Sequence, residues 1–231
     1  MSLVEINNLS KTYQMGEVTI SALKDVSLEI EEGTFVSVVG PSGSGKSTLL
    51  NLIGVLDQPS SGSIKVANQE VGRLNNKERA NFRGDNLGFV FQNFNLIPVL
   101  TVYENVEYPL LMVKNEDSGS QREHINGLLD AVGVLEQQSK RPSQISGGQM
   151  QRVAVARALV TRPKLVIADE PTANLDHDTA YKIINLMKEM KEKWNTTFIF
   201  STHDPKIIGE AEIIFTLEDG MIKNREDRRI Q

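Results

Sequence analysis

The chain has 231 residues, a formal net charge of −5 at pH 7 and no cysteine. That length allows one large domain, or one domain with a subdomain, to bury a sizeable core. The lack of cysteine excludes disulfides, thiolate catalysis and cysteine-based zinc sites. The acidic balance argues against a protein that coats nucleic acid, so no nucleic acid is expected as a partner.

The first six residues lack the basic flank and apolar core of a secretory signal. The most apolar stretches, such as 109–113, are far shorter than the roughly 20 residues that span a bilayer. We therefore expect a cytoplasmic protein that reaches a membrane only through a partner.

The first third of the chain is predicted to be mainly strands, at 3–9, 20–30, 35–39, 62–66 and 87–91. A glycine-rich loop interrupts them after the third strand and leads into the apolar segment 49–53. Its sequence is Gly40-Pro41-Ser42-Gly43-Ser44-Gly45-Lys46-Ser47-Thr48.

This strand, loop and helix order around G-x-x-x-x-G-K-[ST] is typical of a nucleotide-phosphate cradle, because glycines let backbone N–H groups turn inward toward an anion. Lys46 is expected to reach the β- and γ-phosphates, and the Ser47 hydroxyl to bind Mg²⁺. A merely flexible Gly/Ser turn would not explain the flanking strand and helix.

From about 101 to 158 the apolar residues recur at helical steps. Ile125, Leu128, Leu129 and Val132 fall on one face of an amphipathic helix. The polar segment 115–121 before them is expected to be a loop. We predict an α-helical subdomain, about 93–163, inserted in an α/β core formed by 1–92 and 164–231.

The segment Ser146-Gly147-Gly148-Gln149 has the S-x-x-Q spacing of a capping box at a helix start. Capping explains the serine and the glutamine but not the glycines, which cost up to about 1 kcal/mol each in a helix relative to alanine. A second anion-binding helix N-terminus would need their bare backbone. If both helix ends serve one γ-phosphate, the simplest geometry is two copies of the chain arranged head to tail.

The last third alternates strands and helices again. The apolar run 164–168 predicts a strand covered on both faces, and Asp169 and Glu170 lie at its carboxyl end, where open α/β sheets bind ligands. Asp169 is expected to serve Mg²⁺ and Glu170 to polarise an attacking water. The alternative is that both residues merely end the strand before Pro171.

A helix at 183–194 and a strand at 197–201 are expected to follow, with Asp204 as the N-cap of a helix that begins at Pro205. His203 would then share the sheet edge of Glu170, where it could contact a γ-phosphate or be simply exposed. A terminal hairpin is predicted at 213–223, and the charged segment 225–229 is expected to be a solvated tail.

Together these segments resemble the nucleotide-binding subunit of an ATP-binding cassette (ABC) transporter, over essentially the whole chain and in the family's order. Residues 40–48 match the family's Walker A loop, 146–149 its signature motif, and 165–169 its Walker B strand. The remaining matches are Tyr13 with the adenine-stacking aromatic, Gln92 with the Q-loop, Glu170 with the catalytic base, 174–176 with the D-loop, and His203 with the switch histidine.

The resemblance implies a P-loop (RecA-like) α/β core with an N-terminal antiparallel β subdomain and an inserted α-helical subdomain. It assigns Glu170, His203, Lys46 and Gln92 to catalysis, and Ser47, Gln92 and Asp169 to Mg²⁺. Each ATP would lie between the Walker A loop of one subunit and residues 146–149 of the other. Partner integral membrane permease subunits would place the protein on the cytoplasmic face of the inner membrane.

Two departures from the family pattern are visible: Ile145 replaces the usual leucine, and Ala173-Asn174 replaces the commoner Ser-Ala. The second departure, taken together with the segments 16–18, 91–98 and 141–144, makes the sequence similar to those of the bacterial lipoprotein-releasing and macrolide-export group. Two alternatives remain at this level: an ABC ATPase that regulates a membrane partner without transport, and a soluble ABC ATPase that acts on DNA or ribosomes.

The segment 93–98, which follows Gln92, is a candidate docking surface for a membrane subunit. Exposed aromatic and aliphatic residues beside a functional loop suit a partner groove. Phe94 and Leu96 could equally belong to the core of the helical subdomain.

Overall fold

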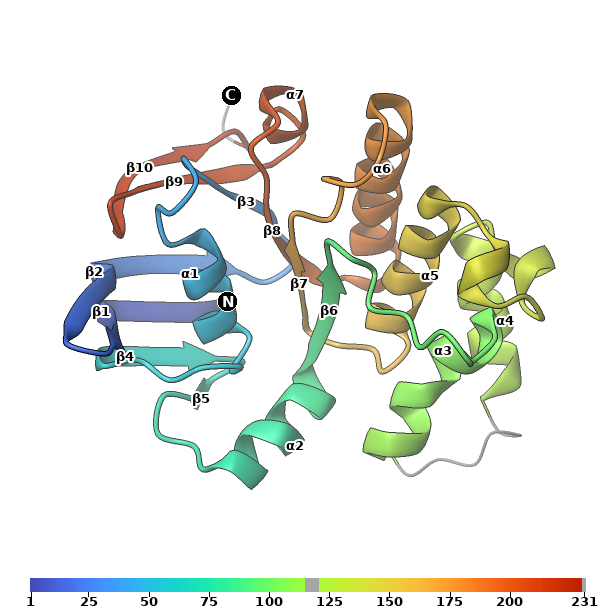
Figure 1. Ribbon diagram of the computed structural model, residues 1–231, viewed down its shortest axis with the longest axis horizontal. Helices are drawn as coiled ribbons and strands as arrows, with labels where there is room; N and C mark the ends of the chain where they lie inside the picture. The colour runs from blue at the N-terminus through green and yellow to red at the C-terminus, as the bar shows by residue number, and fades with distance from the viewer. Residues whose placement is uncertain (115–120, 230–231) are drawn as a thin grey trace.

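The structure is a computed structural model that describes residues 1–114 and 121–229. Two sheets and a block of helices make up the molecule (Figure 1). Except for its last residue, the loop expected at 115–121 lies outside the described residues.

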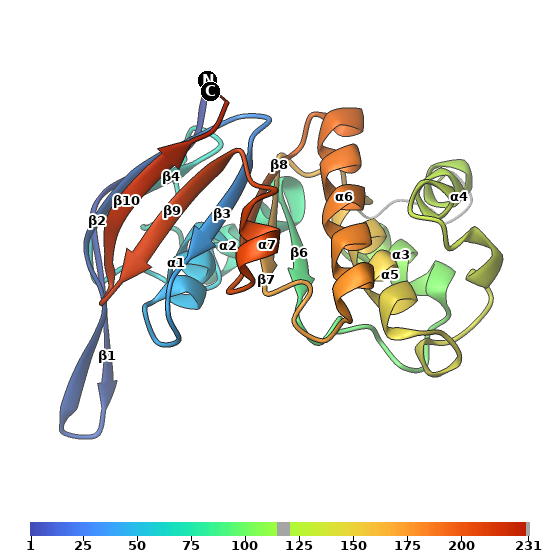
Figure 2. The same ribbon diagram turned by 90° about the horizontal axis from the view of Figure 1, so that it is seen from above.

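A four-stranded antiparallel sheet, in the order β2-β1-β4-β5, covers one side of the molecule. Its strands are β1 (Ser2–Met15), β2 (Val18–Glu31), β4 (Ser61–Val66) and β5 (Gln69–Glu70). The first two strands are longer than predicted and form a hairpin whose far end projects beyond the sheet (Figure 2). The antiparallel β subdomain expected from the sequence is therefore confirmed.

A six-stranded sheet, in the order β10-β9-β3-β8-β7-β6, forms the centre, and only β10 runs antiparallel to its neighbour. Its strands are β3 (Phe35–Val39), β6 (Leu87–Phe91), β7 (Leu165–Asp169), β8 (Thr197–Ser201), β9 (Ile213–Glu218) and β10 (Met221–Asp227). The predicted tail is wrong in part, because Arg225–Asp227 pair with β9.

The helices are α1 (Lys46–Ile53), α2 (Asn76–Asn86), α3 (Val102–Pro109) with the π-helical turn η1 (Leu110–Lys114), α4 (Arg122–Ala131), α5 (Gly147–Leu159), α6 (His177–Trp194) and α7 (Pro205–Ile208), with short 3₁₀ turns at Leu135–Gln137 and Pro142–Gln144. The helices α3 to α6 lie together on the side of the central sheet away from β1 and β2 (Figures 1 and 2). The sequence did not predict α2.

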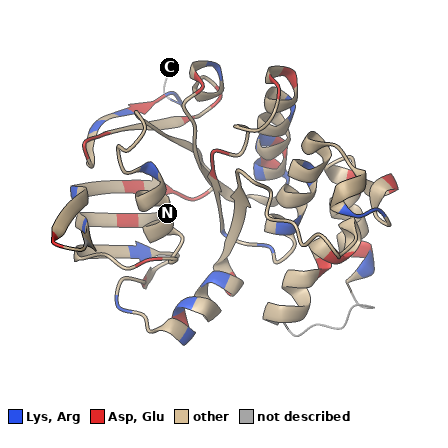
Figure 3. Ribbon diagram, in the orientation of Figure 1, with Lys and Arg blue, Asp and Glu red and all other residues tan. Residues whose placement is uncertain are grey.

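Alternation along the central strands separates two cores. Val166 and Ala168 of β7 pack with the helices α3 to α6, whereas Leu165 and Ile167 pack with α1 and the antiparallel sheet. Because successive side chains of a strand point to opposite faces, one buried sheet serves both layers. Charges of both signs are interspersed over the described residues (Figure 3).

Candidate functional site

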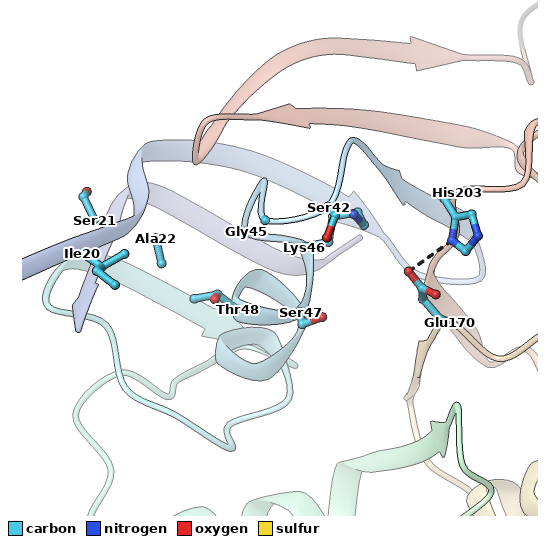
Figure 4. Close-up of a pocket in the computed structure, with 11 residues that line it drawn as sticks. Ile20, Ser21, Ala22, Ser42, Gly45, Lys46, Ser47, Thr48, Glu170 and His203 are labelled. Atoms are coloured by element: carbon cyan, nitrogen blue, oxygen red, sulfur yellow. Dashed lines mark ion pairs between the residues drawn. The ribbon is translucent and has the colours of Figure 1, made fainter. Parts of the chain in front are cut away.

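The site lies at the carboxyl ends of the parallel strands β3, β7 and β8, where open α/β sheets bind ligands. A cleft of about 650 Å³ opens there (Figure 4). Its lining comprises Ile20, Ser21, Ala22, Ser42, Gly43, Gly45, Lys46, Ser47, Thr48, Glu170 and His203. The fold thus brings the predicted phosphate loop together with Glu170 and His203, which lie far from it in sequence.

The phosphate loop requires glycine where it enters α1. Gly45 has φ of 105°, and a Cβ there would lie 2.6 Å from the carbonyl oxygen of Ala22 on β2. Gly43 has φ of 77°, but a Cβ on it would meet nothing within 4 Å, so this part of the loop faces open space. The loop backbone and the N-terminus of α1 are therefore accessible to an anion.

The Lys46 side chain is buried and bends back over this loop. Its ammonium donates to the carbonyl oxygens of Gly40 at 2.8 Å and of Pro41 at 2.9 Å. The buried Ser44 hydroxyl of the same loop has no hydrogen-bond partner among the described residues. A phosphate oxygen would offer Lys46 a charged acceptor, which makes a stronger hydrogen bond than a neutral carbonyl.

Buried Ser201 connects the two carboxylate residues at the end of β7. Its hydroxyl donates to Oδ1 of Asp169 at 2.6 Å and accepts the backbone N–H of Glu170 at 2.9 Å. Glu170 has a left-handed backbone with φ of 46°, which is uncommon for a residue other than glycine and is concentrated at functional sites. Its Oε1 lies 3.3 Å from Nδ1 of the exposed His203 (Figure 4).

Ser47 and Asp169 suit a magnesium ion held mainly by a nucleotide. Mg²⁺ in such sites takes one or two carboxylates together with phosphate oxygens and water. Ser47 is exposed in the cleft on the first turn of α1, and Asp169 ends β7 beside Glu170. Within the described ranges, no group of three acidic or histidine side chains could hold a metal without such help.

Gln92 and the helix start at 146–149 are not among the residues that line the cleft. Gln92 is exposed after β6, and Nδ2 of Asn174 donates to its carbonyl oxygen at 3.0 Å. Ser146 and Gln149 form the predicted capping box at the start of α5. One chain therefore does not bring this helix start together with the phosphate loop.

Packing inside the chain accounts for one of the two signature glycines. A Cβ on Gly148 would lie 2.7 Å from Cγ2 of Thr179 on α6, so that position has little room for a side chain. A Cβ on Gly147 would make only ordinary contacts, the nearest at 3.7 Å with Leu175. Packing within the chain therefore explains Gly148 but not Gly147. Only Gly147 still calls for another explanation, such as a ligand that approaches its backbone.

Tyr13 lies at the edge of the cleft rather than in its lining. It pairs across the β1–β2 hairpin with Ile20, which does line the cleft, and its hydroxyl donates to Oδ2 of Asp57 at 2.8 Å. Burial and this hydrogen bond raise the pKa of the Tyr13 phenol.

Sequence reasoning missed four residues of the site: Ser201 and the β2 residues Ile20, Ser21 and Ala22. For Ser201, the only sequence indication was a serine at the end of the apolar strand β8, and that indication is weak. The other three could have been found only from the register of the hairpin, which places Ile20 opposite Tyr13.

The strand–loop–helix cradle beside a carboxylate pair at the end of a buried strand defines a P-loop nucleoside triphosphatase. Comparison with known proteins specifies the family. The family model described as "ABC transporter" matches residues 23–173, which is more than half of the chain. A second model, described as an AAA domain of a putative AbiEii toxin, matches only 141–209.

The chain therefore belongs to the ABC transporter family, and it is an ATP-binding, ATP-hydrolysing subunit of that family. It is 42% identical to the lipoprotein-releasing system ATP-binding protein LolD of Pseudoalteromonas translucida, covering 99% of this chain and 98% of LolD. It is also 42% identical to the macrolide export ATP-binding/permease protein MacB of Syntrophobacter fumaroxidans, but there it spans only 31% of the relative.

The fold predicted from the sequence is confirmed by a solved structure. The ATP-binding cassette MJ0796, a protein of Methanocaldococcus jannaschii, was solved as a dimer in a post-hydrolysis state bound to ADP and Pi. It matches with a TM-score of 0.89 at 44% sequence identity, over 98% of this chain and 99% of that one. These similarities favour a transporter ATPase over one that acts on DNA or ribosomes.

Proposed function

We propose that two copies of this chain associate head to tail around two ATP molecules. Residues 146–149 support this proposal by their position, because they form the capped start of α5 and do not line the cleft of their own chain. Gly147 leaves bare backbone at that helix N-terminus, which suits the γ-phosphate of a nucleotide held by another copy. The dimeric form of the MJ0796 cassette, bound to ADP and Pi, supports this arrangement.

Within each site, different residues bind the nucleotide, hold Mg²⁺ and activate the attacking water. Lys46 exchanges its two carbonyl acceptors for the β- and γ-phosphates, and Tyr13 stacks on the adenine. Glu170 accepts a proton from the attacking water, and His203 contacts the γ-phosphate. Mg²⁺, held by Ser47, Gln92 and Asp169, would offset the charge of the phosphates. Hydrolysis then favours the open dimer over the closed one.

Complementation between two inactive variants tests the shared site. Lys46→Ala removes the lysine that binds phosphate in the phosphate loop. Gly147→Asp places a carboxylate against the γ-phosphate of the ATP held by the other copy. An acidic residue at a helix N-terminus is compatible with the helix dipole, so Gly147→Asp should not harm the fold. Each variant alone should lack ATPase activity. A mixed dimer of the two variants keeps one intact site of two, so equal amounts should recover between about a quarter of the wild-type rate, if chains pair at random, and about half, if only mixed dimers form. A mixture no more active than its parts would refute the shared site.

We further propose that the dimer drives conformational change in integral membrane subunits at the cytoplasmic face of the inner membrane. None of the helices in 1–114 and 121–229 is long and apolar enough to cross a membrane. The name of MacB joins an ATP-binding part to a permease, and LolD is named for a lipoprotein-releasing system. We propose that this chain likewise works with a permease.

We propose that the segment 93–98, and Phe94 in particular, forms the docking surface for that partner. Leu96 packs against the helical core, whereas Phe94 is half-buried and not part of that packing. Arg157 of α5 donates to the Phe94 carbonyl oxygen at 2.8 Å, and a cavity of about 360 Å³ between α2, β6, η1 and α5 includes Asn95 and Arg157.

Phe94→Glu is expected to weaken capture of the membrane subunit while ATP binding stays at the wild-type level. Val18→Glu, a control at an exposed apolar position on the β1–β2 hairpin, should leave capture unchanged. Co-purification from detergent and an ATP titration measure the two effects. Loss of both binding activities in Phe94→Glu would assign this side chain to the core instead.

A further inference from the structure

A hydrogen-bonded cluster holds the ring of Tyr13. The Tyr13 hydroxyl donates to Oδ2 of Asp57 at 2.8 Å, and the Lys11 ammonium donates to Oδ1 of the same carboxylate at 2.7 Å. Lys11 also donates to the carbonyl oxygen of Gln58 at 2.7 Å and lies over the Tyr13 ring, 4.8 Å from its centroid. One carboxylate therefore fixes both the phenol and the cation that covers the ring.

The cluster leaves one face of the ring for a ligand. Tyr13 and Ile20 are opposite each other in the antiparallel β1–β2 pair, so their side chains project from the same face of the sheet, and Ile20 lines the cleft. Lys11 occupies one face of the half-buried ring by a cation–π contact. A planar base entering from the cleft can stack only on the opposite face.

The Asp57 carboxylate stays ionised and the Tyr13 phenol stays neutral at neutral pH. Burial opposes ionisation of Asp57, but the hydrogen bonds from Lys11, the Gln58 backbone and Tyr13 outweigh it, and the pKa of Asp57 is lowered. The Tyr13 phenol has a raised pKa because of its burial and its bond to Asp57. The phenol therefore stays a donor and the carboxylate an acceptor.

We propose that Asp57 and Lys11 are positioning residues for adenine, which lock the Tyr13 ring in its stacking orientation before the nucleotide arrives. This inference rests on the proposed stacking of Tyr13 on adenine. A side chain that is already fixed loses less rotational freedom on binding than a mobile one. Releasing the ring should therefore weaken ATP binding by about twofold to tenfold.

Two ligands separate positioning from folding: ATP, and inorganic tripolyphosphate, which fills the phosphate loop but has no adenine. The measured quantity is the ratio of the Kd for ATP to the Kd for tripolyphosphate, each with magnesium. Asp57→Asn, Lys11→Met and Tyr13→Phe should each raise this ratio by the stated factor. For Asp57→Asn and Lys11→Met, KM for ATP should increase while kcat at saturation is kept. Asp25→Asn removes a carboxylate that accepts from Asn8 at 2.7 Å in the same sheet and should leave the ratio unchanged.

A double-mutant cycle tests whether Asp57 acts through Tyr13. In a Tyr13→Phe background, Asp57→Asn should raise the ratio by less than it does in the wild-type background, since the bond between the two side chains is already gone and only the contact through Lys11 remains to be lost. Equal weakening of both ligands in Asp57→Asn would overturn the inference in favour of a merely structural role.

Tyr13→Ala distinguishes the stacking of Tyr13 on adenine from the positioning role of Asp57 and Lys11. If Tyr13→Ala leaves the ratio at the wild-type value, the proposed stacking itself is refuted. If Tyr13→Ala raises the ratio while Asp57→Asn and Tyr13→Phe leave it unchanged, the stacking stands and the positioning role is overturned.

Discussion

Ser201 lies fully buried between Asp169 and Glu170 and hydrogen-bonds to both. These bonds link the carboxylate expected to serve Mg²⁺ to the backbone of the expected base. A buried polar group that loses its partner costs about 1–3 kcal/mol. The relative placement of the two carboxylates therefore depends on one hydroxyl from the neighbouring strand.

Ser201→Ala should lower kcat for ATP hydrolysis more than it raises KM. It should also destabilise the fold by about 1–3 kcal/mol, because the half-buried Asp169 carboxylate and Glu170 N–H both lose a partner. Ser37→Ala is a matched control: Ser37 is fully buried on the adjacent strand β3, and its hydroxyl has no partner among the described residues. Steady-state kinetics and urea denaturation measure both variants. Equal effects of the two substitutions would contradict the role of Ser201.

The residues of the phosphate loop were predictable because the loop is continuous in sequence and its spacing has a mechanical cause. Ser201 was not, since its role exists only when β8 lies beside β7. The hydrogen bonds from Lys46 to the Gly40 and Pro41 carbonyl oxygens were equally unpredictable from the sequence. A motif specifies a residue type, but it does not specify what that residue contacts when no ligand is bound.

At the scale of elements, α2 shows what apolar periodicity cannot detect. Phe82 is its one buried residue in a sequence otherwise dominated by polar side chains. The helix starts at a capping box formed by Asn75 and Glu78, and that spacing was its available sequence signal. The other α-helices longer than one turn bury two or more apolar residues each.

Phe82→Ala should lower the free energy of unfolding by about 3–5 kcal/mol, because it removes the single apolar anchor of α2 from the core that contains α1. Lys77→Ala, on an exposed position of the same helix, should stay within about 0.5 kcal/mol of wild type. Urea denaturation compares the two variants. A cost below about 1 kcal/mol for Phe82→Ala would mean that α2 contributes little to the fold.

At the scale of the whole molecule, the end of the described chain joins the two sheets. Arg229 pairs with Asp227 at the end of β10 and with Glu31 at the end of β2. The solvated tail predicted there was wrong because the charged residues satisfy one another across the sheets. Charge alternation in the sequence does not distinguish a tail from an edge strand.

This cluster should make stability depend on pH. The hydrogen bond from Arg229 lowers the pKa of Asp227 from 3.8 to about 2 and also lowers the pKa of Glu31. Depressed carboxyl pKa values stabilise the fold above the unfolded-state values, and that contribution is lost as pH falls from about 4.5 to 2.

Arg229→Gln should therefore lower the urea midpoint at pH 7, and the difference from wild type should shrink strongly as the pH falls to 2. Lys223→Gln removes the same charge from an exposed position of β10 and controls for net charge. A difference of equal size at both pH values would show that Arg229 stabilises the fold by packing rather than through the two carboxylates.

In the proposed assembly, a second copy of the chain completes each ATP site. Glu170→Gln should slow hydrolysis by about 10²–10⁴-fold, since the proposed general base is lost while binding is kept, and so trap ATP in the closed dimer. Sedimentation velocity of Glu170→Gln should show a dimer with ATP and magnesium, and a monomer without nucleotide or when Gly147→Asp is added. A Glu170→Gln protein that stays monomeric with ATP, or a dimer that Gly147→Asp does not disrupt, would contradict the account.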